Sequence, residues 1–240
     1  KKTKKIKRRK NILNQINSII SSYKIVNIPS LPPMTLSFFG YLSYENINNI
    51  ENIINKKKND TLKIPDCLLF IPETLVIYDN QKSILYITKI INKNISNTKN
   101  IYQKLINEFE KITHTIKKNN KYEKINFKKR KKISPKSNIS KSNFVKNINI
   151  SKKYIKDGDI FQVVPSHRFS ANYNSTGKKL YQVLRKTNPS PFLYYFNLPN
   201  FNIVGSSPEI LVRLRDNVIT IRPIAGTRPR GKNKTQDISY

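Results

Sequence analysis

The sequence predicts an α+β fold with antiparallel strand pairing. Three observations lead to this prediction. Apolar residues recur at helical spacing in several segments. Short runs of β-branched and aromatic residues are bounded by proline, glycine, asparagine or aspartate, as strands and their turns usually are. Several of these runs follow one another as hairpins, with helices before them, which implies antiparallel pairing.

The N-terminal region, residues 1–116, begins with a basic run and continues into a predicted amphipathic helix. Apolar residues from Ile12 to Ile20 recur at helical spacing, and the helix should end before the proline-rich loop 29–33. A second helix is expected over residues 101–116. Between the two helices, short strands are expected at residues 36–42, 68–71, 75–78 and 84–87, with turns at Pro72-Glu73 and Asp79-Asn80.

Residues 117–141 are polar, strongly basic and interrupted by Pro135. Such a stretch is typical of a solvated linker or loop, here between the N-terminal region and a second region at residues 142–240. A nucleic-acid-binding arm is the alternative. It has less support, because only Tyr122 and Phe127 could stack on bases.

In the second region, a helix from Phe144 to Ile155 should stop at Asp157-Gly158, where glycine can adopt the left-handed conformation of a C-cap. A strand is expected at residues 160–169, at an edge or with a bulge because Pro165 interrupts it. A short helix around residues 180–184 should follow. Further strands are expected at residues 192–198, 201–205, 210–215 and 218–224, the last two joined by Asp216-Asn217.

The net charge of +32 alone would suggest a protein that binds nucleic acid or another polyanion. The lysines are spread along the chain with isoleucine and asparagine instead of forming a stripe with interleaved aromatics. Residues 1–150 hold +22 of the charge, since residues 151–240 carry 15 basic and 5 acidic side chains. An A/T-biased coding sequence would produce this pattern on tolerant surfaces, so nucleic acid is not expected as a partner, although polyanion binding stays open.

Cys67 is the only cysteine and cannot form an internal disulfide. It precedes the apolar run 68–70, so a buried, inert thiol is expected. The sequence shows no signal peptide and no apolar run of membrane length, which favours a cytoplasmic protein without membrane contact. It does not begin with methionine, so we expect a piece of a longer product. The two histidines, His114 and His167, lack the spacing of zinc ligands, and His167 is expected on a strand face.

Four blocks of the second region resemble the large subunit of anthranilate synthase, in the chorismate-utilising enzyme family. They occur in the family's order within residues 144–240, and residues 39–44 and 64–66 resemble the family's N-terminal region more loosely. The resemblance implies the α+β fold of this family, in which antiparallel sheets pack together with helices outside and which is expected to be incomplete here. It also implies chorismate as the substrate. The four blocks are Gly158–Val164, Asn188–Pro191, Gly205–Ile210 and Pro223–Gly231.

Three residues in the last two blocks carry the implied chemistry. Gly226 and Thr227 resemble the family's chorismate-binding Gly-Thr pair, which presents a backbone N–H and a hydroxyl. Glu209 resembles the general acid that protonates the departing C4 hydroxyl. A hairpin turning at Asp216-Asn217 would place residue 209 opposite roughly residue 224, so Glu209 and the Gly-Thr pair should be neighbours.

Ala225 distinguishes between members of the family. Aminodeoxychorismate synthases, isochorismate synthases and salicylate synthases tend to have a lysine at this position, whereas alanine leaves room for ammonia. The resemblance therefore implies anthranilate formation from chorismate and ammonia, with ammonia supplied by a glutamine amidotransferase subunit. Aminodeoxychorismate synthase component I remains the alternative enzyme.

Pro191, Phe192 and Leu193 resemble the segment that binds tryptophan as a feedback inhibitor. The family more often has tyrosine and methionine at the last two positions, and the upstream serine-containing motif of that pocket is absent from this sequence. Both replacements keep apolar volume, so retention of feedback control stays open.

The resemblance also implies Mg²⁺, with ligands expected beyond residue 240 and no metal site within the 240 residues. We expect the 240 residues alone to be inactive and poorly folded, because missing strands would leave apolar faces and sheet edges uncovered. A different class also stays open, namely an inactive remnant with a basic surface that binds polyanions.

Overall fold

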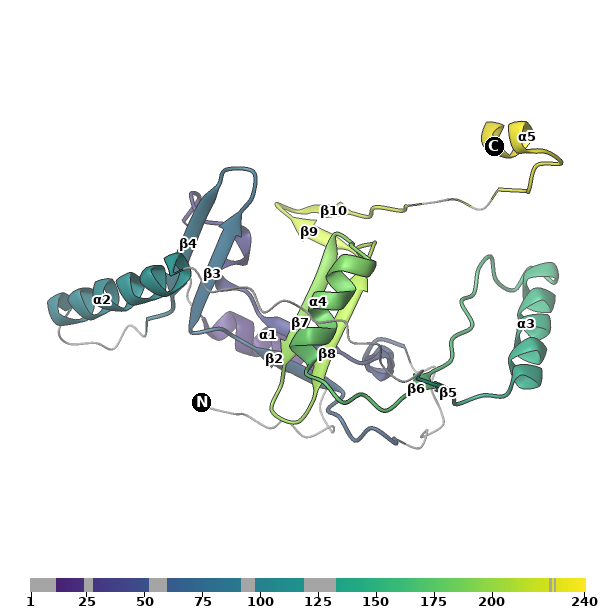
Figure 1. Cartoon of the computed structure of the whole chain (residues 1–240), viewed down its shortest axis with the longest axis horizontal. Helices are drawn as coiled ribbons and strands as arrows, with labels where there is room; N and C mark the ends of the chain where they lie inside the picture. The colour runs from purple at the N-terminus through teal and green to yellow at the C-terminus, as the bar shows by residue number, and fades with distance from the viewer. Residues whose placement is uncertain are drawn as a thin grey trace. The chain divides into compact units, whose positions relative to one another are not determined.

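The computed structural model of the chain combines helices with small antiparallel sheets, which confirms the α+β class (Figure 1). Every sheet in the described part of the chain is an antiparallel pair of strands. The chain divides into two compact units, Lys1–Lys121 and Tyr122–Tyr240. The structure describes residues 12–23, 28–51, 60–91, 98–118, 133–224, 226 and 228–240.

In the first unit, helix α1 (Ile12–Ser22) is confirmed at the predicted place, and its backbone N–H at Ile12 donates to Asn49 Oδ1 at 3.4 Å. Two short 3₁₀ helices follow, η1 (Pro33–Leu36) and η2 (Tyr44–Asn49). Between them lies β1 (Phe39–Leu42), which pairs with β2 (Cys67–Phe70). The segment before β2 is also held, because Asn46 Nδ2 donates to the carbonyl of Asp66 at 2.7 Å.

Glycine is required at position 40 of β1. Gly40 has φ 150°, and a Cβ at this position would overlap the carbonyl oxygen of Leu68 on the paired strand. Beside it, Tyr41 donates its hydroxyl to the carbonyl of Pro65 at 2.7 Å. The two strands therefore approach each other more closely than a side chain at position 40 would permit.

The second hairpin of this unit joins β3 (Thr74–Asp79) to β4 (Ile84–Lys89). Its turn is stabilised by Asp79, whose Oδ1 accepts from the backbone N–H groups of Gln81 and Lys82 at 2.9 and 3.1 Å. Ile77 in β3, with 9% of its surface exposed, is the only hydrophobic residue in the described ranges that counts as buried. Helix α2 (Thr98–Lys117) follows and extends the predicted helix by a turn at its N-terminus.

An ion-pair cluster attaches α2 to this hairpin. Lys89 Nζ lies 2.8 and 2.6 Å from the two carboxylate oxygens of Glu108 and 3.3 Å from Glu73 Oε1. These carboxylates, first of all the hydrogen bond to Glu108, raise the pKa of Lys89 above its usual value. The ammonium of Lys89 thus connects the end of β4 to the middle of α2.

The second unit opens with β5 (Lys136–Ser137) and α3 (Lys141–Lys156). The Ser140 side chain caps α3 by accepting from the N–H of Asn143, and the helix ends at Asp157 before Gly158 at φ 83°, as predicted. The strand predicted at residues 160–169 is wrong. Only Phe169 and Ser170 form a strand, β6, which pairs with β5. Pro165 has no N–H for a ladder, and no strand in the described ranges lies beside residues 160–168.

His167 is therefore not on a strand face, contrary to the prediction. Its ring lies between two aromatic rings in edge-on geometry, 4.8 Å from Phe144 of α3 and 4.3 Å from Phe169 of β6. The imidazole thus joins α3 to the β5–β6 pair through aromatic contacts.

Helix α4 (Gly177–Thr187) packs along the hairpin of β7 (Phe192–Asn197) and β8 (Asn202–Ser207), as Figure 1 shows. Thr176 caps the helix by accepting from the N–H of Lys179 at 3.3 Å. The rings of Tyr181 in α4 and Tyr195 in β7 stack with centroids 6.1 Å apart. A Cβ at Gly177 would lie 3.0 Å from Asn202 of β8, so the helix starts in close contact with the hairpin.

The last elements are the hairpin of β9 (Arg213–Arg215) and β10 (Val218–Thr220), followed by the short helix α5 (Lys234–Ser239). Asp216 and Asn217 form the turn with φ 49° and 59°, as the sequence predicts for a two-residue hairpin loop. Both strands are shorter than predicted, and Pro223 limits β10 because it cannot donate to a ladder. Large apolar side chains of this region are exposed, among them Leu211 at 91% and Ile219 at 68%.

Candidate active site

The β7–β8 hairpin brings two of the sequence blocks side by side. Phe192 pairs with Ser207 and Leu193 with Ser206, so the segment after Asn188 lies along the segment that leads to Glu209. The hydroxyl of Ser206 also donates to the carbonyl of Asn188 at 2.9 Å. Residues 13 to 18 positions apart in the sequence thus form one local structure.

A glycine allows this hairpin to pack. Gly205 lies opposite Tyr194, and a Cβ at position 205 would overlap the phenol ring of that tyrosine. Tyr194 and Phe196 follow each other on the same face with ring centroids 5.9 Å apart. The strand that leads to Glu209, β8, therefore contains a glycine that the ring of Tyr194 covers.

Glu209 lies just after β8 and is exposed. Its backbone carbonyl accepts from Ser207 Oγ at 3.0 Å, which closes a small turn around Pro208. The turn directs the chain from β8 toward β9. A carboxylic acid at such an open position can reach a small molecule without displacing other side chains.

The register of β9 and β10 agrees with the geometry expected for Glu209. Val218 pairs with Arg215 and Thr220 with Arg213. The same register, if continued, sets residue 209 opposite residue 224, but the observed ladder ends at Arg213 and Thr220. The proximity of Glu209 to the Gly-Thr pair therefore stays a prediction.

Of the predicted chorismate-binding pair, the structure describes Gly226 only. Gly226 is exposed, and a Cβ there would meet no atom of the described residues within 4 Å. Thr227, and Ala225 on the other side, lie outside the described residues. The block ends at Arg230 and Gly231, which are held by Asp237 of α5 through bonds of 2.7 and 2.9 Å.

The predicted tryptophan-binding residues lie at the start of β7. Pro191 precedes the strand, Phe192 is 42% exposed, and Leu193 is half-buried. Beside them, the hydroxyl of Ser190 is buried and has no hydrogen-bond partner among the described residues. The three predicted residues thus lie together at the start of β7. Their role in binding tryptophan stays a prediction.

No three His, Cys, Asp or Glu side chains in the described ranges are placed to hold a metal ion. Mg²⁺ usually keeps several waters and needs only one or two protein carboxylates, so the ligands expected beyond residue 240 stay a prediction.

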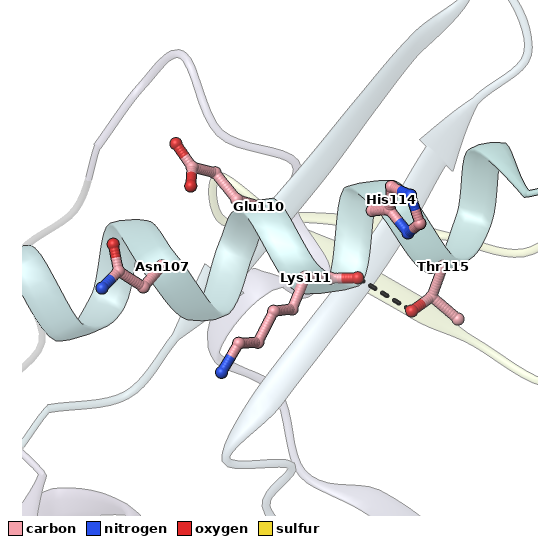
Figure 2. A pocket seen from close by; sticks show the side chains of 5 residues that line it. All are labelled: Asn107, Glu110, Lys111, His114 and Thr115. Atoms are coloured by element: carbon pink, nitrogen blue, oxygen red, sulfur yellow. Dashed lines mark hydrogen bonds between the residues drawn. The ribbon is translucent and has the colours of Figure 1, made fainter.

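A shallow, open hollow lies on the first unit, along α2. Figure 2 shows its lining residues on the surface of that helix, with the hydroxyl of Thr115 donating to the carbonyl of Lys111 at 2.8 Å. The hollow has a single wall, because all its lining residues belong to one helix, and it includes none of the predicted site residues. The lining residues are Asn107, Glu110, Lys111, His114 and Thr115.

Asp237 is not among the site residues expected from the sequence. Its role depends on contacts with Arg230 and Gly231, seven and six positions upstream, which composition does not reveal. A local signal existed, because Asn233 and Gln236 have the spacing of a helix N-cap and its partner. That pattern places α5 directly after the Pro223–Gly231 block.

Comparison with known proteins defines the class. Residues 2–240 match the family described as chorismate binding enzyme, and the chain therefore belongs to this family. It is 36% identical over 192 residues to anthranilate synthase component 1 of Acinetobacter calcoaceticus, covering 77% of this chain and 37% of that protein. It is 52% identical over 101 residues to the protein of the same name from Cereibacter sphaeroides, covering 42% and 20%.

The fold agrees with a solved structure of the same kind. The crystal structure of anthranilate synthase component I from Streptococcus pneumoniae TIGR4 superposes with a TM-score of 0.70 at 26% sequence identity. The match covers 86% of this chain and 46% of that one. The chain thus spans less than half the length of these relatives. In the described ranges, no helix combines the length and apolar character needed to cross a bilayer.

Proposed function

We propose that the polypeptide carrying this sequence acts as the large subunit of an anthranilate synthase in tryptophan biosynthesis. The proposal rests on the family match over residues 2–240 together with the Pro223–Gly231 block. In this block the chain has Ala225 at the position where the sister enzymes tend to have a lysine. Relatives named anthranilate synthase component 1 support it. The reaction consumes chorismate and ammonia and releases anthranilate, pyruvate and water.

The residues of this chain take three parts in the proposed reaction. Gly226 and Thr227 bind chorismate through a backbone N–H and a hydroxyl. Glu209 donates a proton to the C4 hydroxyl, so that it leaves as water when ammonia adds to the ring. The place of Glu209 in the Gly205–Ile210 block and the register of β9–β10, which if continued sets residue 209 opposite residue 224, support this assignment. The small side chain of Ala225 leaves the path of ammonia free.

The partners follow from the same assignment. Ammonia is delivered by a glutamine amidotransferase subunit, and tryptophan acts on Pro191, Phe192 and Leu193 if feedback control is retained. Anthranilate formation depends on Mg²⁺, whose ligands are expected beyond residue 240.

The test is product identification. The full gene product that contains residues 1–240 is supplied with chorismate, Mg²⁺ and ammonium at mildly alkaline pH, and products are separated by chromatography and detected by fluorescence. Anthranilate supports the proposal. Aminodeoxychorismate would assign the chain to the sister enzyme. If neither appears and the protein binds polyanions with a steep dependence on salt, the remnant hypothesis gains support.

A further inference from the structure

The carboxylate of Asp237 binds two consecutive residues of the Pro223–Gly231 block. Oδ2 accepts from Arg230 Nη1 at 2.7 Å, and Oδ1 accepts from the backbone N–H of Gly231 at 2.9 Å. Both oxygens are thus directed to the last residues of the block that contains Gly226. Helix α5, which carries Asp237, is the yellow element at the C-terminal end in Figure 1.

Neighbouring residues continue the same connection. The backbone N–H of Lys232 donates to Gln236 Oε1 at 2.8 Å, so three consecutive residues, 230 to 232, donate to side chains of α5. Asn233 caps α5, since its Oδ1 accepts from the N–H of Gln236 at 2.9 Å. This set of contacts is called the clasp below and consists of Arg230, Gly231, Lys232, Gln236 and Asp237.

The clasp also depends on close backbone contact at Gly231. A Cβ at this position would overlap the backbone nitrogen of Asp237 and would lie 2.7 Å from its Cα. Only glycine therefore fits between the block and α5 in this arrangement. The steric requirement at Gly231 is independent of the charge on Asp237, so the two can be tested separately.

The exposure of the ion pair argues against a role in overall stability. The side chain of Arg230 is 90% exposed and that of Asp237 is 35% exposed. Exposed ion pairs contribute little to the free energy of unfolding. The two oxygens of Asp237 instead restrict the conformation of the chain, because together they hold Arg230 and Gly231 in place.

We infer that Asp237 is a positioning residue for the substrate-binding block: through the clasp it fixes Arg230 and Gly231, and thereby the C-terminal end of the block that carries Gly226. This inference rests on the proposed function of the Gly-Thr pair. Asp237 itself has no contact with substrate in this scheme. Loss of the clasp lets the block sample several conformations, of which one binds chorismate, so the apparent affinity for chorismate falls.

The experiment uses the full gene product with ammonium as the amine and measures kcat and KM for chorismate. The variants are Asp237→Asn, which keeps an oxygen for Gly231 but removes the charge facing Arg230, Asp237→Ala, Arg230→Gln and the double variant Asp237→Asn/Arg230→Gln. Asp216→Asn is the matched control. It removes an aspartate from the exposed β9–β10 turn, where asparagine tolerates the left-handed conformation.

Either Asp237→Asn or Arg230→Gln should raise KM by about tenfold with kcat within about twofold, because ground-state and transition-state binding weaken together. The double variant should be no worse than either single variant, since both break the same contact. Asp216→Asn should match the wild type. An unchanged KM in both Asp237 variants, or a lower unfolding temperature as the only effect, would overturn the inference.

A second readout separates this inference from the proposed function. Hydrogen exchange of peptides covering residues 226–231 is measured without substrate for wild type, Asp237→Ala and Asp216→Asn. Faster exchange in Asp237→Ala alone supports the clasp even if the wild type forms no anthranilate, in which case the proposed function fails by itself. Equal exchange in all three proteins overturns the clasp whatever the activity.

Discussion

The hydroxyl of Ser206 donates a hydrogen bond of 2.9 Å to the carbonyl oxygen of Asn188. This bond joins the end of α4 to β8, three residues before Glu209. It also connects the Asn188–Pro191 block to the Gly205–Ile210 block, which are separate in the sequence. Because Asn188 follows the last turn of α4, its carbonyl has no helical partner of its own. Ser206 therefore connects helix, hairpin and candidate acid.

Replacing Ser206 by alanine should weaken this connection. The variant Ser206→Ala loses one hydrogen bond to a carbonyl at the protein surface, so the free energy of unfolding should fall by about 0.5–1 kcal/mol. Denaturant unfolding of the full gene product measures it. Ser151→Ala is the control, because the Ser151 hydroxyl bonds to Asn147 within α3, where alanine favours the helix. Equal losses in both variants would contradict a specific role for Ser206.

Three glycines allow a graded test of backbone constraints. In Gly40→Ala, the new Cβ overlaps the carbonyl of Leu68 and φ is positive, so we expect destabilisation of about 2 kcal/mol or more. In Gly158→Ala, φ is 83° but the space is open, so about 1 kcal/mol from backbone strain alone is expected. Gly226→Ala should leave stability unchanged, because Gly226 is exposed and a new Cβ would meet no atom of the described residues within 4 Å.

Thermal and denaturant unfolding of the three variants give the comparison. The expected order of destabilisation is Gly40→Ala, then Gly158→Ala, then Gly226→Ala. If Gly40→Ala were no worse than Gly158→Ala, β1 and β2 would not approach as closely as the structure shows. A strong loss of stability in Gly226→Ala would mean that this residue is packed against other parts of the protein.

The thiol of Cys67 should react slowly in the folded protein. Burial in β2, where Cys67 pairs with Leu42, raises the pKa of the thiol, so less thiolate is present at pH 8 than in the unfolded chain. Alkylation by iodoacetamide, localised by peptide mass spectrometry, should be slower in native than in denatured protein. Its rate should keep rising with pH beyond the point where the denatured thiol levels off. Equal native and denatured rate profiles would contradict the burial of this thiol.

Local signals in the sequence predict much of this fold. Asp157-Gly158 ends α3 and Asp216-Asn217 closes the β9–β10 hairpin, because each of these residues acts through its own backbone conformation or cap. The predicted strand at residues 160–169 shows where such signals stop. Phe161–Val164 has the composition of a strand, but a strand also needs a neighbour, which a distant segment must supply.

In the candidate site too, local motifs predict some residues, whereas contacts between separate segments are not predicted. The identities of Glu209, Gly226 and Thr227 follow from short motifs, whereas the contact of Asp237 with Arg230 and Gly231 appears only when the chain turns into α5. Polar residues in a polar stretch carry no hydrophobic pattern that would reveal which partner they bind. The register of β9 and β10, if continued, would bring Glu209 toward the Gly-Thr pair. The observed ladder ends at Arg213 and Thr220, before it reaches either.

Glu209→Gln tests the proposed acid directly. Glutamine keeps the size and a carbonyl oxygen of the side chain but cannot donate a proton as an acid, so anthranilate formation should fall by about 100-fold or more. Binding of chorismate, measured by calorimetry, should stay within about threefold of the wild type, because Gly226 and Thr227 remain. Glu110→Gln, on the exposed surface of α2, is the matched control and should keep full activity. Full activity of Glu209→Gln would assign the proton transfer to another residue, whereas loss of chorismate binding would make Glu209 a binding residue.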